Sequence, residues 1–300
     1  MFQARLRIAR VPVALRVHGP FRPDHFEHRF GPYADRDEPP GRAASSELAS
    51  PEGAAAPAAF SLTLWLELLG KNLATEVPYP GVKAYVTPGG VKLLGSGLSM
   101  WLSPADGRAE AFVSGLLRLP PPAFDEDAGP ADTPLRILVT HSLLEREQGA
   151  LVHACGLIHR GRGVLLIGPG GAGKSTSAGL ARPGQVLSDD QVALLADPGG
   201  RLMLASTPFV GMYGRVLPPT EVPLAALVVL DRHRAGRLEP LERFDALRAF
   251  LGCLPLYTRT PQTATYALGL AELVARVVPL WKGAPRLGSP LEDWLEGLGL

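Results

Sequence analysis

A phosphate-binding loop is the clearest chemical feature of the sequence. Residues 168–175, GPGGAGKS, fit the pattern G-x-x-x-x-G-K-[ST]. In such loops the backbone N–H groups surround phosphate oxygens, the lysine reaches the β- and γ-phosphates, and the hydroxyl ligates Mg²⁺. A short apolar strand over 164–167 is predicted before the loop and a helix over 175–181 after it, which is the context that the pattern requires. The sequence therefore predicts that the chain binds ATP with Mg²⁺.

The positions of the loop have separate expected roles. Lys174 is predicted to be catalytic, because a cation beside the transferring phosphoryl group stabilises its charge. Ser175 is predicted to ligate the metal. A glycine-rich turn with a chance lysine is the alternative explanation. The predicted nucleotide-binding residues are Gly168, Pro169, Gly170, Gly171, Ala172, Gly173, Lys174, Ser175 and Thr176.

Two adjacent carboxylates follow the loop. Asp189 and Asp190 come after the predicted helix, a turn at 183–184 and a short predicted strand over 185–188. We expect this strand to lie beside the P-loop strand and to bring the carboxylates to the phosphate end of the sheet. Neighbouring side chains of a strand point to opposite faces, so one carboxylate is predicted to meet the metal and the other the acceptor. A solvated turn is the alternative.

A histidine precedes the loop in an apolar segment. Residues 151–160, the glycines at 161–163 and the strand at 164–167 indicate a β-hairpin. This hairpin is predicted to fold the region of His153 back towards the phosphate-binding loop. His153 is then either a packed core residue or a partner of the metal, the aspartates or the γ-phosphate; both interpretations stay open.

The segment LVHACGLIHRGRGVLLIGPGGAGKST, followed by LSDD, resembles the core of the HPr kinase family. The helix predicted at 136–148 and residues 206–209 resemble the smaller relatives of that family, over about 132–255 in all. The resemblance implies a divergent small relative of α/β (α+β) class. It would have a phosphoenolpyruvate carboxykinase-like P-loop domain with a mixed sheet, preceded by a smaller β-rich lobe.

The resemblance also implies an activity. Asp189 would be the general base, Asp190 a metal-side carboxylate and His153 a catalytic partner, with the two aspartate roles open to reversal. The expected function is an ATP-dependent kinase that transfers the γ-phosphate to a Ser/Thr hydroxyl of a protein or peptide. Relatives linked with peptide modification make a peptide serine the favoured acceptor. The alternatives are a conventional P-loop NTPase or small-molecule kinase, and a non-catalytic nucleotide-dependent binding module.

Composition limits the partners. The chain has 300 residues, 46% hydrophobic and 20% charged, with a net charge of +1. This balance predicts no nucleic-acid and no membrane partner, and a homo-oligomer is compatible with it. The two cysteines, Cys155 and Cys253, make no disulfide framework, and the N-terminus lacks the apolar core of a signal peptide. We therefore expect a cytoplasmic protein.

Two domains are predicted. Short alternating strands with glycine turns before residue 124 indicate a β-rich N-terminal lobe, 1–124, carrying a flexible insertion at 36–59 that is rich in Ala, Pro and Gly. A proline-rich and acidic linker at 120–130 marks the boundary. The nucleotide-binding domain is predicted to span 125–300, with helices covering its sheet.

Overall fold

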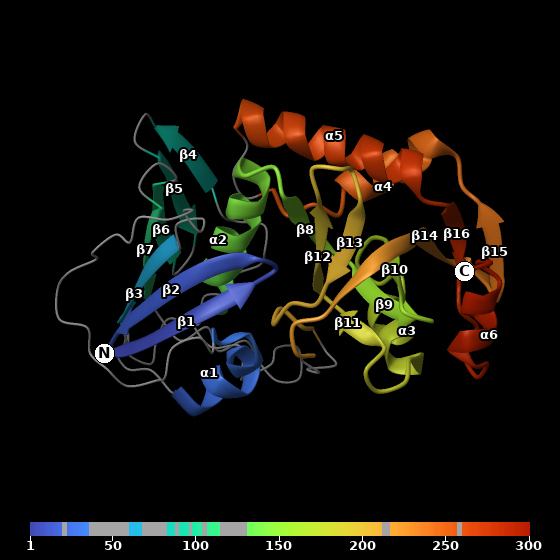
Figure 1. Ribbon diagram of the computed structural model, residues 1–300, viewed down its shortest axis with the longest axis horizontal. Coiled ribbons are helices and arrows are strands. Elements are labelled where there is room, and N and C mark those ends of the chain that lie inside the picture. The colour runs from blue at the N-terminus through green and yellow to red at the C-terminus, as the bar shows by residue number, and fades with distance from the viewer. Residues whose placement is uncertain are drawn as a thin grey trace.

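The computed structural model describes residues 1–19, 23–35, 60–67, 83–87, 90–95, 98–103, 107–114, 131–211, 217–256 and 260–300. The predicted insertion at 36–59 and the predicted linker at 120–130 lie outside the described residues. Two mixed β-sheets with few helices make this an α+β protein, as the sequence predicted at that coarser level. Figure 1 shows the two sheets in opposite halves of the molecule, with helix α2 between them.

The first sheet has seven strands, in the order β1-β2-β3-β7-β6-β5-β4. Its first two strands form a hairpin in which Leu6 pairs with Val13 and Ile8 with Val11, all buried, while Arg7 between them on β1 is exposed. A short helix, α1, follows the hairpin. The elements are β1 (Phe2–Ile8), β2 (Val11–His18), α1 (Pro23–Phe30), η1 (Gly31–Tyr33), β3 (Phe60–Glu67), β4 (Lys83–Thr87), β5 (Gly90–Gly95), β6 (Leu98–Ser103) and β7 (Arg108–Ser114).

The second sheet follows the order β11-β9-β10-β14-β13-β12-β8, and β16 pairs with both β14 and β15. Its elements are α2 (Asp132–Glu145), β8 (Gly149–His153), β9 (Cys155–His159), β10 (Arg162–Ile167), α3 (Lys174–Leu180), β11 (Val186–Ser188), β12 (Gln191–Ala196), β13 (Leu202–Ala205), β14 (Glu221–Ala235), β15 (Arg237–Pro240), α4 (Arg243–Leu251), α5 (Pro261–Val277), β16 (Leu280–Ala284) and α6 (Leu291–Glu296). A capping box between Thr260 and Thr263 fixes the start of α5.

The P-loop strand, β10, has neighbours that differ from those expected. It pairs antiparallel with β9 in the predicted hairpin and parallel with β14. Strand β11 pairs with β9, so the expectation that it lies beside the P-loop strand was wrong: the hairpin partner already occupies that edge. His153 ends β8, a separate strand that pairs with β12, so the hairpin itself spans only 155–167.

Helix α2 joins the two halves of the molecule through its packing. Twelve of its fourteen residues are buried, because it is covered on one side by the first sheet and on the other by β8. One continuous apolar core contains first-sheet residues such as Leu15 and Leu62, helix residues such as Leu138, and Leu151 and Phe209 from the second half. The predicted division at residue 124 stays a prediction, but the core does not stop there.

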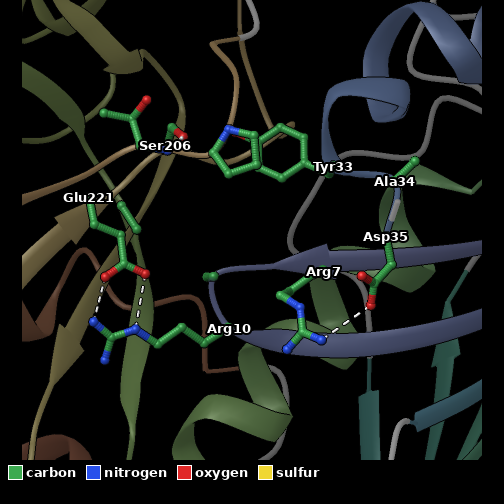
Figure 2. A pocket seen from close by; sticks show the side chains of 11 residues that line it. Arg7, Arg10, Tyr33, Ala34, Asp35, Ser206 and Glu221 are labelled. Atoms are coloured by element: carbon green, nitrogen blue, oxygen red, sulfur yellow. Dashed lines mark hydrogen bonds and ion pairs between the residues drawn. The ribbon is translucent and has the colours of Figure 1, made fainter. Parts of the chain in front are cut away.

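A polar junction lies where the β1–β2 turn meets the second sheet. Arg10 makes a two-pronged ion pair with Glu221 of β14, with Nε to Oε1 at 2.9 Å, and Arg7 pairs with Asp35 at 3.2 Å. Figure 2 shows both pairs around a cavity of about 210 Å³ that Tyr33 also lines. The four charges satisfy one another, so the junction carries no net charge. Among the described residues, no helix is long and apolar enough to cross a membrane.

The start of β8 generates a stability prediction. Gly149 has φ +143°, and a Cβ there would lie 2.1 Å from the carbonyl oxygen of Leu194. Gly149→Ala should therefore lower the free energy of unfolding by about 3 kcal/mol or more, from strain and overpacking together. Gly161→Ala is the matched control, because Gly161 has φ +74° but open space around its Cβ position, so that only strain of about 1–2 kcal/mol is expected. Urea unfolding of both variants measures the difference, and equal losses would contradict it.

Candidate functional site

The glycine-rich loop that was predicted to bind phosphate lies between β10 and α3, in the strand–loop–helix context that the sequence predicted. Gly171, with φ +74°, and Gly173, with φ +110°, adopt left-handed backbone conformations that other residues rarely take. Gly173 is also the N-cap of α3. Of the other predicted nucleotide-binding residues, Gly168 and Ala172 are buried, Ser175 is half-buried, and Pro169, Gly170 and Thr176 are exposed. The rim of the loop therefore faces solvent while its base packs against the protein.

Lys174 is held against the loop itself. Its Nζ donates to the carbonyl oxygen of Gly168 at 2.7 Å and to that of Pro169 at 3.3 Å. The residue is only 7% exposed, and burial lowers the pKa of its ammonium, an effect that the nearby charge of Asp190 opposes. The ammonium is thus fixed at the loop, in the place where a phosphate would meet it.

The two aspartates lie in a bend between β11 and β12 rather than on a strand. Asp190 is bound on both carboxylate oxygens: Arg136 donates from Nη1 to Oδ2 at 2.6 Å, and His153 donates from Nδ1 to Oδ1 at 2.9 Å. Burial acts to raise the pKa of Asp190, but the Arg136 charge and the two hydrogen bonds outweigh it and hold the pKa well below its usual range. Asp190 is therefore ionised and a weak proton acceptor.

Asp189 has a different environment. It is 4% exposed, and its Oδ1 accepts from the backbone N–H of Gly211 at 2.7 Å. The preceding hydroxyl, on Ser188, donates to the Phe209 carbonyl oxygen at 2.9 Å. The segment 206–211 therefore holds the bend from one side. Asp189 also lines a hollow of about 110 Å³, together with Ala178, Arg182, Pro183, Gly184, Val186 and Leu217.

Two of the predicted catalytic groups, Asp189 and Lys174, interact electrostatically with the buried thiol of Cys155. Burial and the charge of Asp189 raise the pKa of Cys155, and the charge of Lys174 opposes them. Lys174 also interacts electrostatically with Asp190. His153 meets Asp190, with its own side chain 47% exposed. The structure thus gathers Lys174, both aspartates and His153 at one end of the hairpin.

Three residues of the site were missed by sequence reasoning. Arg136 lies in the helix predicted at 136–148, for which no polar role was expected, and its Nε also donates to Asp132 one turn earlier. Arg29 of α1 lies 3.4 Å from Asp132, from Nη2 to Oδ1. A charged pair within an otherwise apolar helix was a usable signal for Arg136 and Asp132. No local pattern marks Arg29.

The oxygen donors suit Mg²⁺ chemically. Ser175 supplies a hydroxyl and Asp190 a carboxylate with an unused lone pair on each oxygen, and Mg²⁺ is usually held by one or two carboxylates together with substrate phosphates. Within the described ranges, no group of three or more His, Cys, Asp or Glu side chains is arranged to hold a metal.

A comparison with models of protein families finds a match to part of the chain. Residues 134–252 match the family model described as SynChlorMet cassette protein ScmC, which covers less than half of the chain. The matched segment runs from α2 to α4 and includes Arg136, His153, the P-loop and both aspartates. No curated protein matches the chain.

The resemblance to the HPr kinase family is corrected by this finding. The matching family is the one described as ScmC, and no match to an HPr kinase family supports the earlier assignment. A P-loop followed by two aspartates is a short pattern that phosphate chemistry alone can impose, so it does not identify a family.

The Asp190 ion pair predicts a pH-dependent contribution to stability. Because its folded-state pKa lies below the ordinary 3.8, Asp190 stabilises the fold above about pH 4 and loses that contribution as the pH falls. Asp190→Asn should lower the free energy of unfolding by about 2 kcal/mol at pH 7 and by clearly less at pH 3. Urea titrations at both pH values test this. Asp245→Asn, in an exposed pair with Arg248, is the control and should have little effect. A loss for Asp190→Asn that is equal at both pH values would contradict the assignment.

Proposed function

We propose that the chain is an ATP-dependent phosphotransferase that moves the γ-phosphate of ATP to a Ser/Thr hydroxyl of a protein or peptide. The observation that carries the proposal is that two neighbouring carboxylates with different surroundings lie beside the lysine of the P-loop. Asp190 is bound by Arg136 and His153, whereas Asp189 meets a backbone N–H and a hollow. Two carboxylates with different environments are the arrangement that separates a metal-side group from a proton acceptor.

The nucleotide would be held by the chain's own donors. The backbone of 168–176 would surround the phosphates, and Lys174 would exchange its bonds to the loop carbonyls for phosphate oxygens. Ser175 and Asp190 would hold Mg²⁺, which supplies charge neutralisation at the β- and γ-phosphates. His153 and Arg136 would keep Asp190 ionised and oriented.

Asp189 would act on the acceptor. As the acceptor oxygen bonds to the γ-phosphorus, the bond from that phosphorus to the bridging oxygen breaks and ADP leaves. Asp189 takes the hydroxyl proton, and Lys174 offsets the charge on the transferring group. The Gly211 N–H donates to Oδ1 of Asp189 and so orients the carboxylate that would take the proton.

The hollow beside Asp189 supports a side-chain hydroxyl as the acceptor. Its volume, about 110 Å³, is well below the roughly 300–1,000 Å³ of pockets that enclose drug-sized molecules. Ala178, Val186 and Leu217 make part of its wall apolar. A protruding serine or threonine fits such a space better than a bulky free metabolite does.

Two further points belong to the proposal. An antiparallel hairpin leading into the P-loop, within a mixed sheet, supports a phosphoenolpyruvate carboxykinase-like arrangement of the nucleotide-binding half. The matched family is described as a cassette protein, so the products of neighbouring genes are the first acceptors to test.

Two substitutions test the chemistry. Lys174→Ala should lower phosphoryl transfer at least about 100-fold, because it removes the cation at the loop. Asp189→Asn should keep ATP binding within a few-fold of wild type and lower transfer by about 10²–10⁴-fold, because the amide cannot accept the proton. Transfer is measured with Mg²⁺ and γ-labelled ATP on peptides and proteins encoded beside the gene, and binding with a fluorescent ATP analogue.

The control is Arg160→Gln, which breaks an exposed ion pair with Glu296 away from the loop and should leave both measurements unchanged. Transfer by Asp189→Asn at the wild-type rate would refute the base assignment. ATP binding with neither transfer nor hydrolysis would favour a nucleotide-dependent binding module, and hydrolysis without any acceptor would favour an NTPase.

A further inference from the structure

A buried arginine of the N-terminal half reaches the candidate site. Arg29, on α1, is 1% exposed and lies outside the segment that matches the family model. Its Nε donates to the Pro208 carbonyl oxygen at 2.7 Å, and its Nη2 donates to that of Val210 at 2.9 Å. Burying a guanidinium is costly unless its donors are satisfied. Here the donors are directed at the two carbonyls that flank Phe209.

The ring of Phe209 is held from two sides. Phe30, the next residue of α1, meets it edge-on with ring centroids 6.4 Å apart, and the Arg136 guanidinium lies 5.0 Å from its centroid. Phe209 is fully buried. Helix α1 therefore holds the segment 208–210 in place through two kinds of contact: hydrogen bonds to its backbone carbonyls and packing against its aromatic ring.

This segment positions the bend that carries the aspartates. The Phe209 carbonyl oxygen accepts from the Ser188 hydroxyl at 2.9 Å and from the Gln191 N–H at 3.1 Å. Two residues later, the Gly211 N–H donates to Asp189 at 2.7 Å. A shift of the segment would move the carboxylate of Asp189 with it.

A second route leads from the same guanidinium to Asp190. Arg29 pairs with Asp132 at 3.4 Å, Asp132 accepts from Arg136, and Arg136 donates to Asp190 at 2.6 Å. Charges alternate along this chain, and Arg29, Asp132 and Arg136 are all buried. Each buried charge thus depends on the next one for its stabilisation.

We propose that Arg29 is a positioning residue that orients both carboxylates of the site, so that helix α1 is part of the phosphotransfer apparatus. The inference rests on the proposed function. The planar guanidinium is needed because it contacts two carbonyl oxygens and one carboxylate at the same time. The ammonium of a lysine is a compact charge and cannot reproduce that geometry.

Steady-state kinetics of the full chain test the role. Arg29→Lys and Arg29→Met should lower kcat for phosphoryl transfer about 10–100-fold, because small misplacements of a catalytic group are costly, while KM for ATP changes by less than about threefold. Arg10→Met is the matched control. It breaks the ion pair between Arg10 and Glu221, which also joins the N-terminal half to the second sheet, but it touches no residue of the site. Both kcat and KM should therefore stay at wild-type values. A wild-type kcat in both Arg29 variants would overturn the proposal.

A double-mutant cycle separates positioning from general stability. In the Asp189→Asn background, Arg29→Lys should lower the residual transfer by a clearly smaller factor than in wild type, because one of the two carboxylates that it positions is already lost. Multiplicative effects would instead indicate a structural role and would overturn the proposal. Thermal unfolding of each variant accompanies the cycle, and Arg29→Lys carries the test where Arg29→Met does not fold.

Hydrogen exchange makes the proposal independent of the reaction. The backbone amides of 188–191 and 209–211 should exchange at least about tenfold faster in Arg29→Lys than in wild type or Arg10→Met. The reason is that the hydrogen bonds of these two stretches depend on the position of the segment 208–210. If wild type transfers no phosphate but this deprotection occurs, the positioning stands and the proposed reaction fails. Unchanged exchange in Arg29→Lys refutes the positioning, whatever the activity.

Discussion

The ion pair between Arg136 and Asp190 is the constraint on which the rest of the site depends. When a carboxylate and a guanidinium are removed from water they must form an ion pair, because an unpaired buried charge costs several kcal/mol. Arg136 reaches Asp190 only because α2 lies between the two sheets, buried on nearly every side. The packing of an apolar helix therefore sets the ionisation and orientation of a polar group at the end of another element.

The same packing joins two parts of the chain that the sequence suggested were separate. Phe209 belongs to the apolar core that begins in the first sheet, yet its carbonyl oxygen holds the bend of the second sheet. Phe209 thus belongs both to the apolar core and to the contacts that position the two aspartates. Moving the two halves apart would separate Arg29 from Asp132 and leave that buried carboxylate with less compensation.

What the sequence predicted well was local. The strand, loop and helix around Lys174 follow from glycine positions and apolar runs within about twenty residues, and the hairpin from 155 to 167 follows from its glycine turn. The neighbours of β10 and the partners of Asp190 are set by pairings between distant segments, which no local period encodes. Arg29 is the extreme case: its contacts lie about 180 residues away, at Pro208 and Val210. The match to the family model could not be inferred either, because a P-loop pattern with two aspartates is too short to distinguish one family from another.

Two neighbouring aspartates acquire different chemistry because a bend, not a strand, presents them. The bend turns Asp190 towards the cations of α2 and β8, and Asp189 towards the N–H of Gly211. An arginine partner keeps a carboxylate ionised and makes it a poor base, whereas Asp189 is oriented by a backbone donor and lines a hollow. The proposed role of Asp189 as proton acceptor therefore rests on what each carboxylate touches rather than on its place in the sequence. It requires that α2, β8 and the segment 206–211 remain packed together.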